Sequence, residues 1–110
     1  MAKMILKRDK YKSARGGYSR LLNIFCRKCK NLIIVYQKDG RGSLLRMYFD
    51  RIFSPEELVG LQKDNIKDIA ILKCKKCGEI IGTPYIYPLE NRPAFRLYQD
   101  STTKKIRKNS

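Results

Sequence analysis

The chain has 110 residues, a length that fits one domain and leaves no room for two independent hydrophobic cores. Its 25 Lys and Arg residues against 10 Asp and Glu residues give a net charge of +15, far beyond the roughly 2–8 that keeps a small domain soluble. The chain contains no histidine, which excludes Cys–His and Ser–His catalysis within it and restricts any zinc site to thiolates or carboxylates.

No segment is typical of a membrane or secreted protein. No run of ~18 apolar residues is present, and the apolar stretch at residues 4–6 is too short for a signal peptide. We therefore expect a cytoplasmic protein with no membrane partner. In that compartment cysteines stay reduced, which favours metal binding over disulfide bonds.

The excess positive charge is concentrated at the two ends of the chain. Residues 1–20 carry many cations against Asp9 alone and include the flexible pair Gly16 and Gly17. Residues 103–110 carry four cations and no acid. The sequence therefore predicts a basic N-terminal arm over 1–20, a folded domain over 21–102 and a basic C-terminal tail over 103–110, with both arms partly disordered without a partner.

Between the arms the sequence is mainly typical of short strands. The β-branched and aromatic run over 32–36 predicts a strand, and the Asp-Gly pair at 39–40 predicts a hairpin turn after it. Residues 45–50 alternate between an apolar face and a face with Arg46 and Tyr48, and residues 94–99 repeat this alternation with Arg96 and Tyr98. Further apolar runs cover 69–73, 80–81 and 85–87, and the nearby prolines argue against a long central strand in that region.

One helix start is well marked in the sequence. Ser54 is a good N-cap, Pro55 suits the first helical position, and Glu57 suits the third. Gly60 weakens the helix, and Asp64 and Asn65 are expected to end it. The sequence thus predicts about two helical turns after Ser54 within a mainly β fold (α+β to a minor extent).

Four cysteines occur as two Cys-x-x-Cys pairs, Cys26 with Cys29 and Cys74 with Cys77. The segments CRKCKNLII and CKKCGEIIG echo each other, since each has basic residues between the cysteines and an Ile-rich strand after them. Two such tight turns can supply the four thiolates of a tetrahedral Zn²⁺ site. The cations beside the cysteines would offset the net negative charge of that centre. We expect one structural zinc ion on these four ligands.

This pattern resembles the zinc-ribbon family, in which a knuckle at the tip of each of two hairpins holds the metal. The resemblance implies an antiparallel β domain with Cys26, Cys29, Cys74 and Cys77 as ligands. The 44 residues between Cys29 and Cys74 depart from the compact form of the family. A longer loop costs only slightly more entropy to close, so the spacing does not forbid the site. Function does not transfer from compact ribbons on this basis.

The cysteine pairs are also compatible with three alternatives to a zinc site. A redox disulfide would need one pair to open a helix in a βαβ context, and neither pair does so convincingly. Iron can replace zinc in a tetrathiolate shell. The cysteines could also be unliganded core residues, although chance rarely places two such pairs in so short a chain.

Three groups of residues are candidates for contacts with nucleic acid. The arms mix phosphate-seeking cations with Tyr, Ser and Gly, the two Arg-x-Tyr segments would form a basic aromatic platform if their strands lie side by side, and the knuckle tips display further cations. The candidates are Lys7, Arg8, Lys10, Lys12, Arg15, Arg20, Arg27, Lys28, Arg46, Tyr48, Lys75, Lys76, Arg96, Tyr98, Lys104, Lys105, Arg107 and Lys108. The same residues are also consistent with a solvated tail, an ordinary sheet face and charge compensation of the metal.

These features predict a non-catalytic protein that binds nucleic acid, preferring RNA to DNA because no recognition helix is visible. A ribosome-associated role is expected, since small basic zinc-ribbon proteins with unstructured arms resemble ribosomal proteins. The alternative is a protein–protein adaptor in a transcription or phage-type assembly, anchored by residues 85–87 and Phe95. A magnesium-dependent nuclease is the third possibility. Its acids would be Asp39, Asp50, Glu79, Glu90 or Asp100, which form no fixed motif.

Overall fold

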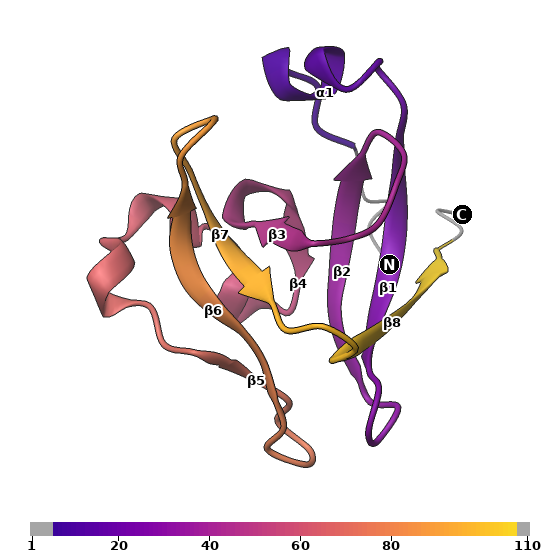
Figure 1. The fold of residues 1–110 in the computed structure, drawn as a ribbon, viewed down its shortest axis with the longest axis vertical. Helices are drawn as coiled ribbons and strands as arrows, with labels where there is room; N and C mark the ends of the chain where they lie inside the picture. Colours follow the sequence, from indigo (N-terminus) through magenta and orange to yellow (C-terminus); the bar gives the residue numbers. More distant parts are fainter. Residues whose placement is uncertain (1–5, 108–110) are drawn as a thin grey trace.

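The structure is a computed structural model that describes residues 6–107. It contains two four-stranded antiparallel sheets, which lie on either side of a shared core (Figure 1). The first sheet has the order β4-β2-β1-β8 and is built from β4 (Ile52–Ser54), β2 (Leu32–Asp39), β1 (Ser19–Cys26) and β8 (Thr102–Ile106). The second sheet has the order β3-β7-β6-β5 and is built from β3 (Arg46–Tyr48), β7 (Arg92–Leu97), β6 (Ile80–Tyr87) and β5 (Leu72–Lys73). The expectation of a mainly β, antiparallel domain with one short helix is confirmed.

Alternating side chains of the two sheets meet to form the core. On β1 the buried positions Leu22 and Ile24 are two residues apart, so they share one face. The second sheet contributes Met47 and Phe95, whose ring lies 4.7 Å from that of Phe49 between ring centroids. The buried apolar cluster is completed by Cys26, Ile34, Tyr36, Ile52, Leu72, Cys74 and Ile81. Two candidate metal ligands thus lie within the core itself.

The predicted helix after Ser54 is wrong. The chain instead forms two 3₁₀ turns, η2 (Glu56–Leu58) and η3 (Leu61–Lys63), with Gly60 between them at a φ of +85°. A left-handed residue interrupts an α-helix, and here it separates two turns that each close two i→i+3 hydrogen bonds. A third such turn, η4 (Ile66–Asp68), follows.

The α-helix lies instead in the predicted N-terminal arm. Helix α1 (Lys10–Ala14) begins at Asp9, whose carboxylate accepts hydrogen bonds from the N–H groups of Tyr11 and Lys12. At the other end of the chain, β8 pairs with β1 from Leu22 opposite Ile106 to Cys26 opposite Thr102. The expectation of partly disordered arms therefore does not hold for these segments, which both have regular secondary structure.

Strand β6 runs unbroken through Pro84, although the prolines argued against a long strand there. Its partner β5 pairs with it only near Ile80 and Gly82, whereas β7 pairs with it from Gly82 to Tyr87. Pro84 therefore lies where β6 has a neighbour on one side only, and its missing N–H costs no bond on the open side. Two other predicted strands are shorter than expected, because 45–50 becomes β3 followed by the 3₁₀ turn η1 (Phe49–Arg51) and 69–73 is reduced to β5. The strand predicted over 32–36 is longer, since β2 continues to Asp39.

Within residues 6–107 the structure has no helix long and apolar enough to cross a membrane.

Candidate metal centre

The two Cys-x-x-Cys pairs occupy the tips of two hairpins from different sheets. Cys26 ends β1 and Cys29 lies in the turn before β2, whereas Cys74 follows β5 and Cys77 lies in the turn before β6. Figure 1 shows these two tips next to each other at one end of the molecule. A group that bound all four sulfurs would therefore join the first sheet to the second.

The two knuckles have the same backbone geometry. The N–H of Lys30 donates to the carbonyl of Cys26, and the N–H of Gly78 donates to that of Cys74, each at 2.8 Å. Both donors have left-handed backbone, with φ of 67° at Lys30 and 78° at Gly78. The sequence echo thus reflects one turn used twice, and a left-handed residue follows the second cysteine in both copies.

The four sulfur atoms lie within 4.8 Å of one another. Two sulfur pairs join the two knuckles, with Sγ–Sγ distances of 3.6 Å for Cys26 and Cys77 and 3.5 Å for Cys29 and Cys74. Thiolates about 2.3 Å from a tetrahedral metal lie about 3.8 Å apart. The cluster therefore fits one four-coordinate metal ion, and the four residues expected from the sequence are brought together.

The thiols have unequal proton affinities. Burial raises the pKa of Cys74, but the N–H groups of Cys77 and Lys76 and the neighbouring thiols outweigh it and lower this pKa to about 6. The N–H of Glu79 lowers the pKa of Cys77, but burial and the other three sulfurs outweigh it and raise this pKa to about 12. Four crowded thiolates repel one another, so the site favours a cation at its centre.

The geometry does not favour a disulfide between the described cysteines. All four are free thiols, and the sulfur atoms of Cys29 and Cys74 are separated by 3.5 Å, against about 2.05 Å in a disulfide bond. Neither pair opens an α-helix. Four thiolates around one metal ion would fill a tetrahedral shell and leave no open position for substrate.

The knuckle cations are exposed, and two of them are paired with acids. Lys28 lies 3.4 Å from Glu79, and Lys75 forms an ion pair with Glu57. Within the described residues, Arg27 and Lys76 form no ion pair. The tips are therefore less strongly basic than the sequence indicated.

The two Arg-x-Tyr segments do lie side by side. Strand β3 pairs with β7 so that Arg46 is opposite Arg96, and Arg96 and Tyr98 are exposed. Tyr48 is an exception, because it is only 7% exposed. Its ring contacts the guanidinium of Arg92 at 3.8 Å, so it cannot stack on a base as expected.

Two other tyrosines belong to the same face, and sequence reasoning missed them as contacts. Tyr85 is opposite Ala94 and Tyr87 is opposite Arg92 across the β6–β7 pair. Arg46 donates a hydrogen bond from Nε to the Tyr85 hydroxyl at 3.0 Å and stacks 4.0 Å from the Tyr87 ring centroid. The alternation of Tyr85, Ile86 and Tyr87 was the available signal, since it places both tyrosines on one face.

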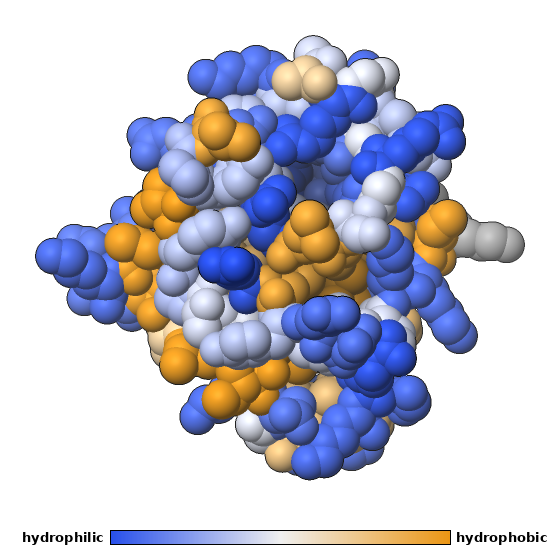
Figure 2. Space-filling view, in the orientation of Figure 1, coloured by the Kyte–Doolittle hydropathy of each residue, from blue (hydrophilic) through white to orange (hydrophobic). Residues whose placement is uncertain are grey.

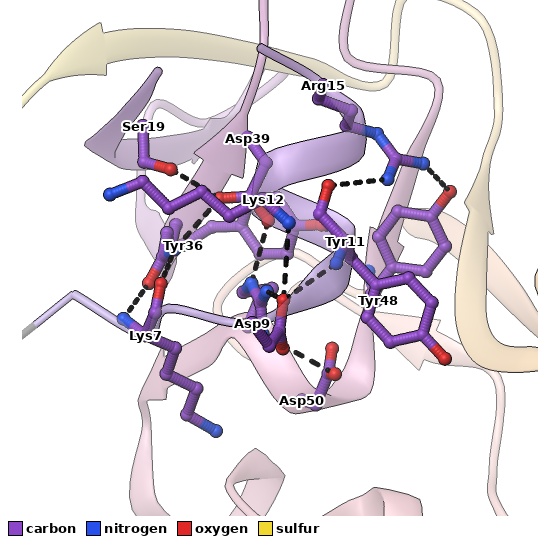
Figure 3. Close-up of polar contacts among 12 residues, drawn as sticks. Lys7, Asp9, Tyr11, Lys12, Arg15, Ser19, Tyr36, Asp39, Tyr48 and Asp50 are labelled. Carbon is purple, nitrogen blue, oxygen red and sulfur yellow. Dashed lines mark hydrogen bonds and ion pairs between the residues drawn. The ribbon is translucent and has the colours of Figure 1, made fainter. Parts of the chain in front are cut away.

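A network of buried ion pairs lies at the opposite end of the molecule from the metal centre and was also missed. The guanidinium of Arg51, 1% exposed, pairs with Asp9 at 2.6 Å, Asp39 at 2.9 Å and Asp50 at 3.5 Å. Arg92, 4% exposed, pairs with Asp50 at 2.8 Å. Figure 3 shows how Asp9 and Tyr11 of the N-terminal segment reach into this network.

The network also holds α1 on the second sheet. Arg15 makes two hydrogen bonds to the Glu90 carboxylate, at 2.7 and 2.9 Å. It also donates to the Tyr48 hydroxyl at 3.0 Å (Figure 3). The sequence marked Arg15 as a phosphate contact and Asp39, Asp50 and Glu90 as candidate magnesium ligands. In the structure Arg15 pairs with Glu90. Asp39 pairs with Arg51, and Asp50 pairs with Arg51 and Arg92, so both roles are disfavoured.

The other candidate contacts are spread over the surface. Lys7, Arg8 and Lys10 are exposed near α1, and Lys104 and Lys105 are exposed on β8. Lys12, Arg20 and Arg107 are half-buried. Lys108 lies outside the described residues. The structure does not gather these cations into one compact site.

Phe95 was expected to anchor a protein interface. That expectation is wrong, because Phe95 is 1% exposed and lies in the core. Tyr85 and Tyr87 are half-buried, and Ile86 is 39% exposed.

Comparison with known proteins gives no matching family model, and neither a curated protein nor a solved structure matches the chain. The fold and the site therefore define its class by themselves. It is a small two-sheet β protein with four clustered cysteines that could hold one metal ion, an arrangement compatible with a zinc ribbon.

Proposed function

We propose that the cysteine cluster holds one structural Zn²⁺ ion and that the protein is a non-catalytic, cytoplasmic RNA-binding protein associated with the ribosome. Zinc is the commonest metal in a closed tetrathiolate shell of reduced cysteines, and iron is the alternative that elemental analysis distinguishes. Bound there, the metal would fix the β1–β2 hairpin to the β5–β6 hairpin. The metal would thereby fix the relative position of the two sheets, and the protein surface that they form would bind the RNA.

The observation that carries the RNA-binding proposal is the positive charge that the fold leaves uncompensated. Six of the acids are used in ion pairs inside the structure or at its knuckles, namely Asp9, Asp39, Asp50, Glu57, Glu79 and Glu90. Exposed cations on α1 and β8 have no such partners among residues 6–107. A polyanion that releases counterions on binding is the partner this surface favours.

Single-stranded or irregular RNA is favoured over duplex DNA by the same surface. The five residues of α1 are too few for a recognition helix, and the face with Arg46, Arg96 and Tyr85 offers guanidinium and ring surfaces for exposed bases. A non-catalytic role is supported by the ion pairs of Asp39, Asp50 and Glu90, since these acids are committed to arginines.

The test is filter binding of the full-length protein to a folded RNA over a series of salt concentrations. Affinity should fall steeply with salt and less steeply in a variant with Lys10, Lys12, Lys104 and Lys105 changed to Gln, by up to about 0.7 in logarithmic slope for each lost contact. Deleting the arm is not a clean test, because Asp9 and Arg15 stabilise the fold. The matched control changes Lys63 and Lys67 to Gln, and its slope should equal that of the wild type. Salt-independent binding, or no binding, would refute the proposal.

A second candidate function, the protein–protein adaptor, is favoured by an apolar groove of about 490 Å³ beside the 3₁₀ turns. Leu58, Leu61 and Ile71 line it, and so do Asp64 and Asp68, which have no ion-pair partner within the described residues. In a chain of charge +15, these acids suit a partner segment that combines basic and apolar side chains.

An adaptor would bring down a protein after nuclease treatment, and the contact would map to this groove. Ile71→Asp should abolish that capture, whereas Leu89→Asp, at a position 82% exposed outside the groove, should leave it unchanged. Capture that disappears with nuclease, or that Ile71→Asp leaves intact, would exclude this candidate.

A further inference from the structure

A cleft opens between the two sheets at the end of β2 that lies away from the metal centre. It has a volume of about 310 Å³, and its walls come from Arg15, the end of β2, residues 40–45 and β3. Figure 2 shows a hollow bordered by hydrophilic side chains above the apolar patch at the centre of the view. The knuckle and this cleft lie at opposite ends of β2, which is eight residues long, so the two sites are separate.

The cleft is lined by four cations, of which Arg15 is paired with Glu90 and the other three have no ion-pair partner among residues 6–107. Arg15, Lys38, Arg41 and Arg46 all contribute to its walls, and Asp39 is the one carboxylate among the described lining residues. That carboxylate is already engaged. It accepts hydrogen bonds from Ser19 and Gln37 on Oδ1 and from Arg51 on Oδ2. The walls therefore have a net positive charge and no free acid.

Lys38 is the least expected of these residues. It is only 7% exposed, and its ammonium donates one hydrogen bond, to the Gly40 carbonyl at 3.2 Å. Within residues 6–107 no carboxylate pairs with it. Burial lowers the pKa of Lys38, and the nearby cations Lys104, Arg20 and Arg15 lower it further. A buried ammonium without a counterion is costly, and an anion in the cleft would remove that cost.

The two arginines of the cleft without an ion-pair partner, Arg41 and Arg46, are held in place by aromatic rings. The Arg41 guanidinium lies 4.9 Å from the centroid of the Tyr18 ring, and Arg46 lies 4.0 Å from that of Tyr87. Stacking occupies the face of a guanidinium and leaves N–H groups at its edge for acceptors in its plane. The cleft therefore combines two guanidinium groups in fixed orientations with one buried ammonium. This arrangement suits a tetrahedral anion, which can accept hydrogen bonds from several directions.

We propose that this cleft binds a phosphate group. The space exceeds what a phosphate alone needs and lies at the lower limit of pockets that hold small organic ligands, about 300 Å³. The phosphate would come from the 5′ end of an RNA or from a free nucleotide. The inference depends on the proposed RNA-binding function only if the phosphate in the cleft belongs to an RNA.

The test measures binding of the full-length, metal-loaded protein to three probes at constant ionic strength. The probes are a short single-stranded RNA with a 5′-phosphate, the same RNA with a 5′-hydroxyl, and a nucleoside 5′-monophosphate. The wild type should bind the phosphorylated RNA at least tenfold more tightly than the hydroxyl form. Lys38→Met and Arg41→Gln should each remove that preference, and the matched control Lys63→Met should keep it.

The outcomes separate the two proposals. If the wild type binds neither RNA, the proposed RNA-binding function fails. In that case, saturable binding of the monophosphate that is lost in Lys38→Met would still support the cleft as a site for free nucleotides. If it binds both RNAs equally and the monophosphate shows no Lys38-dependent binding, the cleft proposal is overturned. Lys38→Met should fold, since it removes an unpaired buried charge; if it does not, Arg41→Gln alone decides, because Arg41 is exposed.

Discussion

Tyr48 illustrates how the surroundings of a single residue decide its role. From the sequence it shares the face opposite Met47 and Phe49 and would be available for stacking on RNA. In the structure its ring is covered by Arg92, and its hydroxyl accepts a hydrogen bond from Arg15. The sequence could not reveal this, because Tyr48 meets Arg92 through the pairing of β3 with β7 and meets Arg15 through packing of the residue that follows α1. The same reason hid the role of Asp39, Asp50 and Glu90.

At the residue scale, Arg51 should be essential for stability. Arg51→Met leaves the Asp39 carboxylate, 5% exposed, without its cation, so we expect a loss of about 3–5 kcal/mol in the free energy of unfolding. Urea denaturation of the metal-loaded protein measures it. The control Arg96→Met, on an exposed side chain, should change the same quantity by less than about 0.5 kcal/mol. Equal effects of the two substitutions would show that the Arg51 network is not stabilising.

The same network predicts how stability depends on pH. Hydrogen bonds from Arg15 hold the pKa of Glu90 below its ordinary value of 4.5. A carboxylate with a lowered pKa contributes stability above its ordinary pKa and loses it as the pH falls through the lowered value. The difference in unfolding free energy between the wild type and Glu90→Gln should therefore be constant near neutral pH and shrink below about pH 4.5. Comparing the two proteins cancels metal loss at acid pH, and a difference that grows as the pH falls would be inconsistent with the ion pair.

At the scale of elements, the two knuckles were predictable and the helix was not. The knuckles rest on a local feature, the Cys-x-x-Cys spacing, which the sequence echo displays directly. The left-handed conformation of Lys30 after the first pair is not visible in the sequence. The helix start at Ser54 was also a local signal, but Gly60 takes a left-handed conformation and the segment packs as separate 3₁₀ turns. Helix α1 has only five residues and no apolar periodicity, so its stability comes from Asp9 and Arg15 contacts distant in sequence.

The knuckle turns give a prediction at the same scale. Gly78→Ala adds a side chain to a residue at φ 78° and should reduce stability by about 1 kcal/mol. Lys30→Gly, at the equivalent position of the other knuckle, should be neutral or stabilising, since it relieves a left-handed lysine at φ 67°. Thermal unfolding of the metal-loaded variants compares them. Equal destabilisation by both substitutions would show that the two turns are not equivalent.

At the scale of the whole molecule, polar or sulfur-bearing side chains of the two sheets meet at both ends of the shared core. At one end is the cysteine cluster at the hairpin tips, and at the other is the ion-pair network under α1. The mainly β class and the cluster followed from the sequence, because alternation and cysteine spacing are visible in one dimension. The pairing of the sheets, the network and the cleft depend on contacts between distant segments and were not predictable from local patterns.

Removing the metal should therefore affect the two ends of the molecule differently. A strong chelator should lower the melting temperature by more than about 10 °C, because structural metal binding contributes several kcal/mol to folding. Hydrogen exchange at a temperature below the transition should increase most at the β1–β2 and β5–β6 tips and least around Arg51. An equal increase in exchange across the chain would show that the metal does not specifically stabilise the two hairpin tips.

The most direct test of the metal centre is native mass spectrometry of the intact protein with elemental identification of the metal. We expect one zinc ion per chain in the wild type and none after Cys74 and Cys77 are both changed to Ser. A wild-type chain free of metal, or one whose metal survives the loss of the second knuckle, would contradict the four-cysteine site.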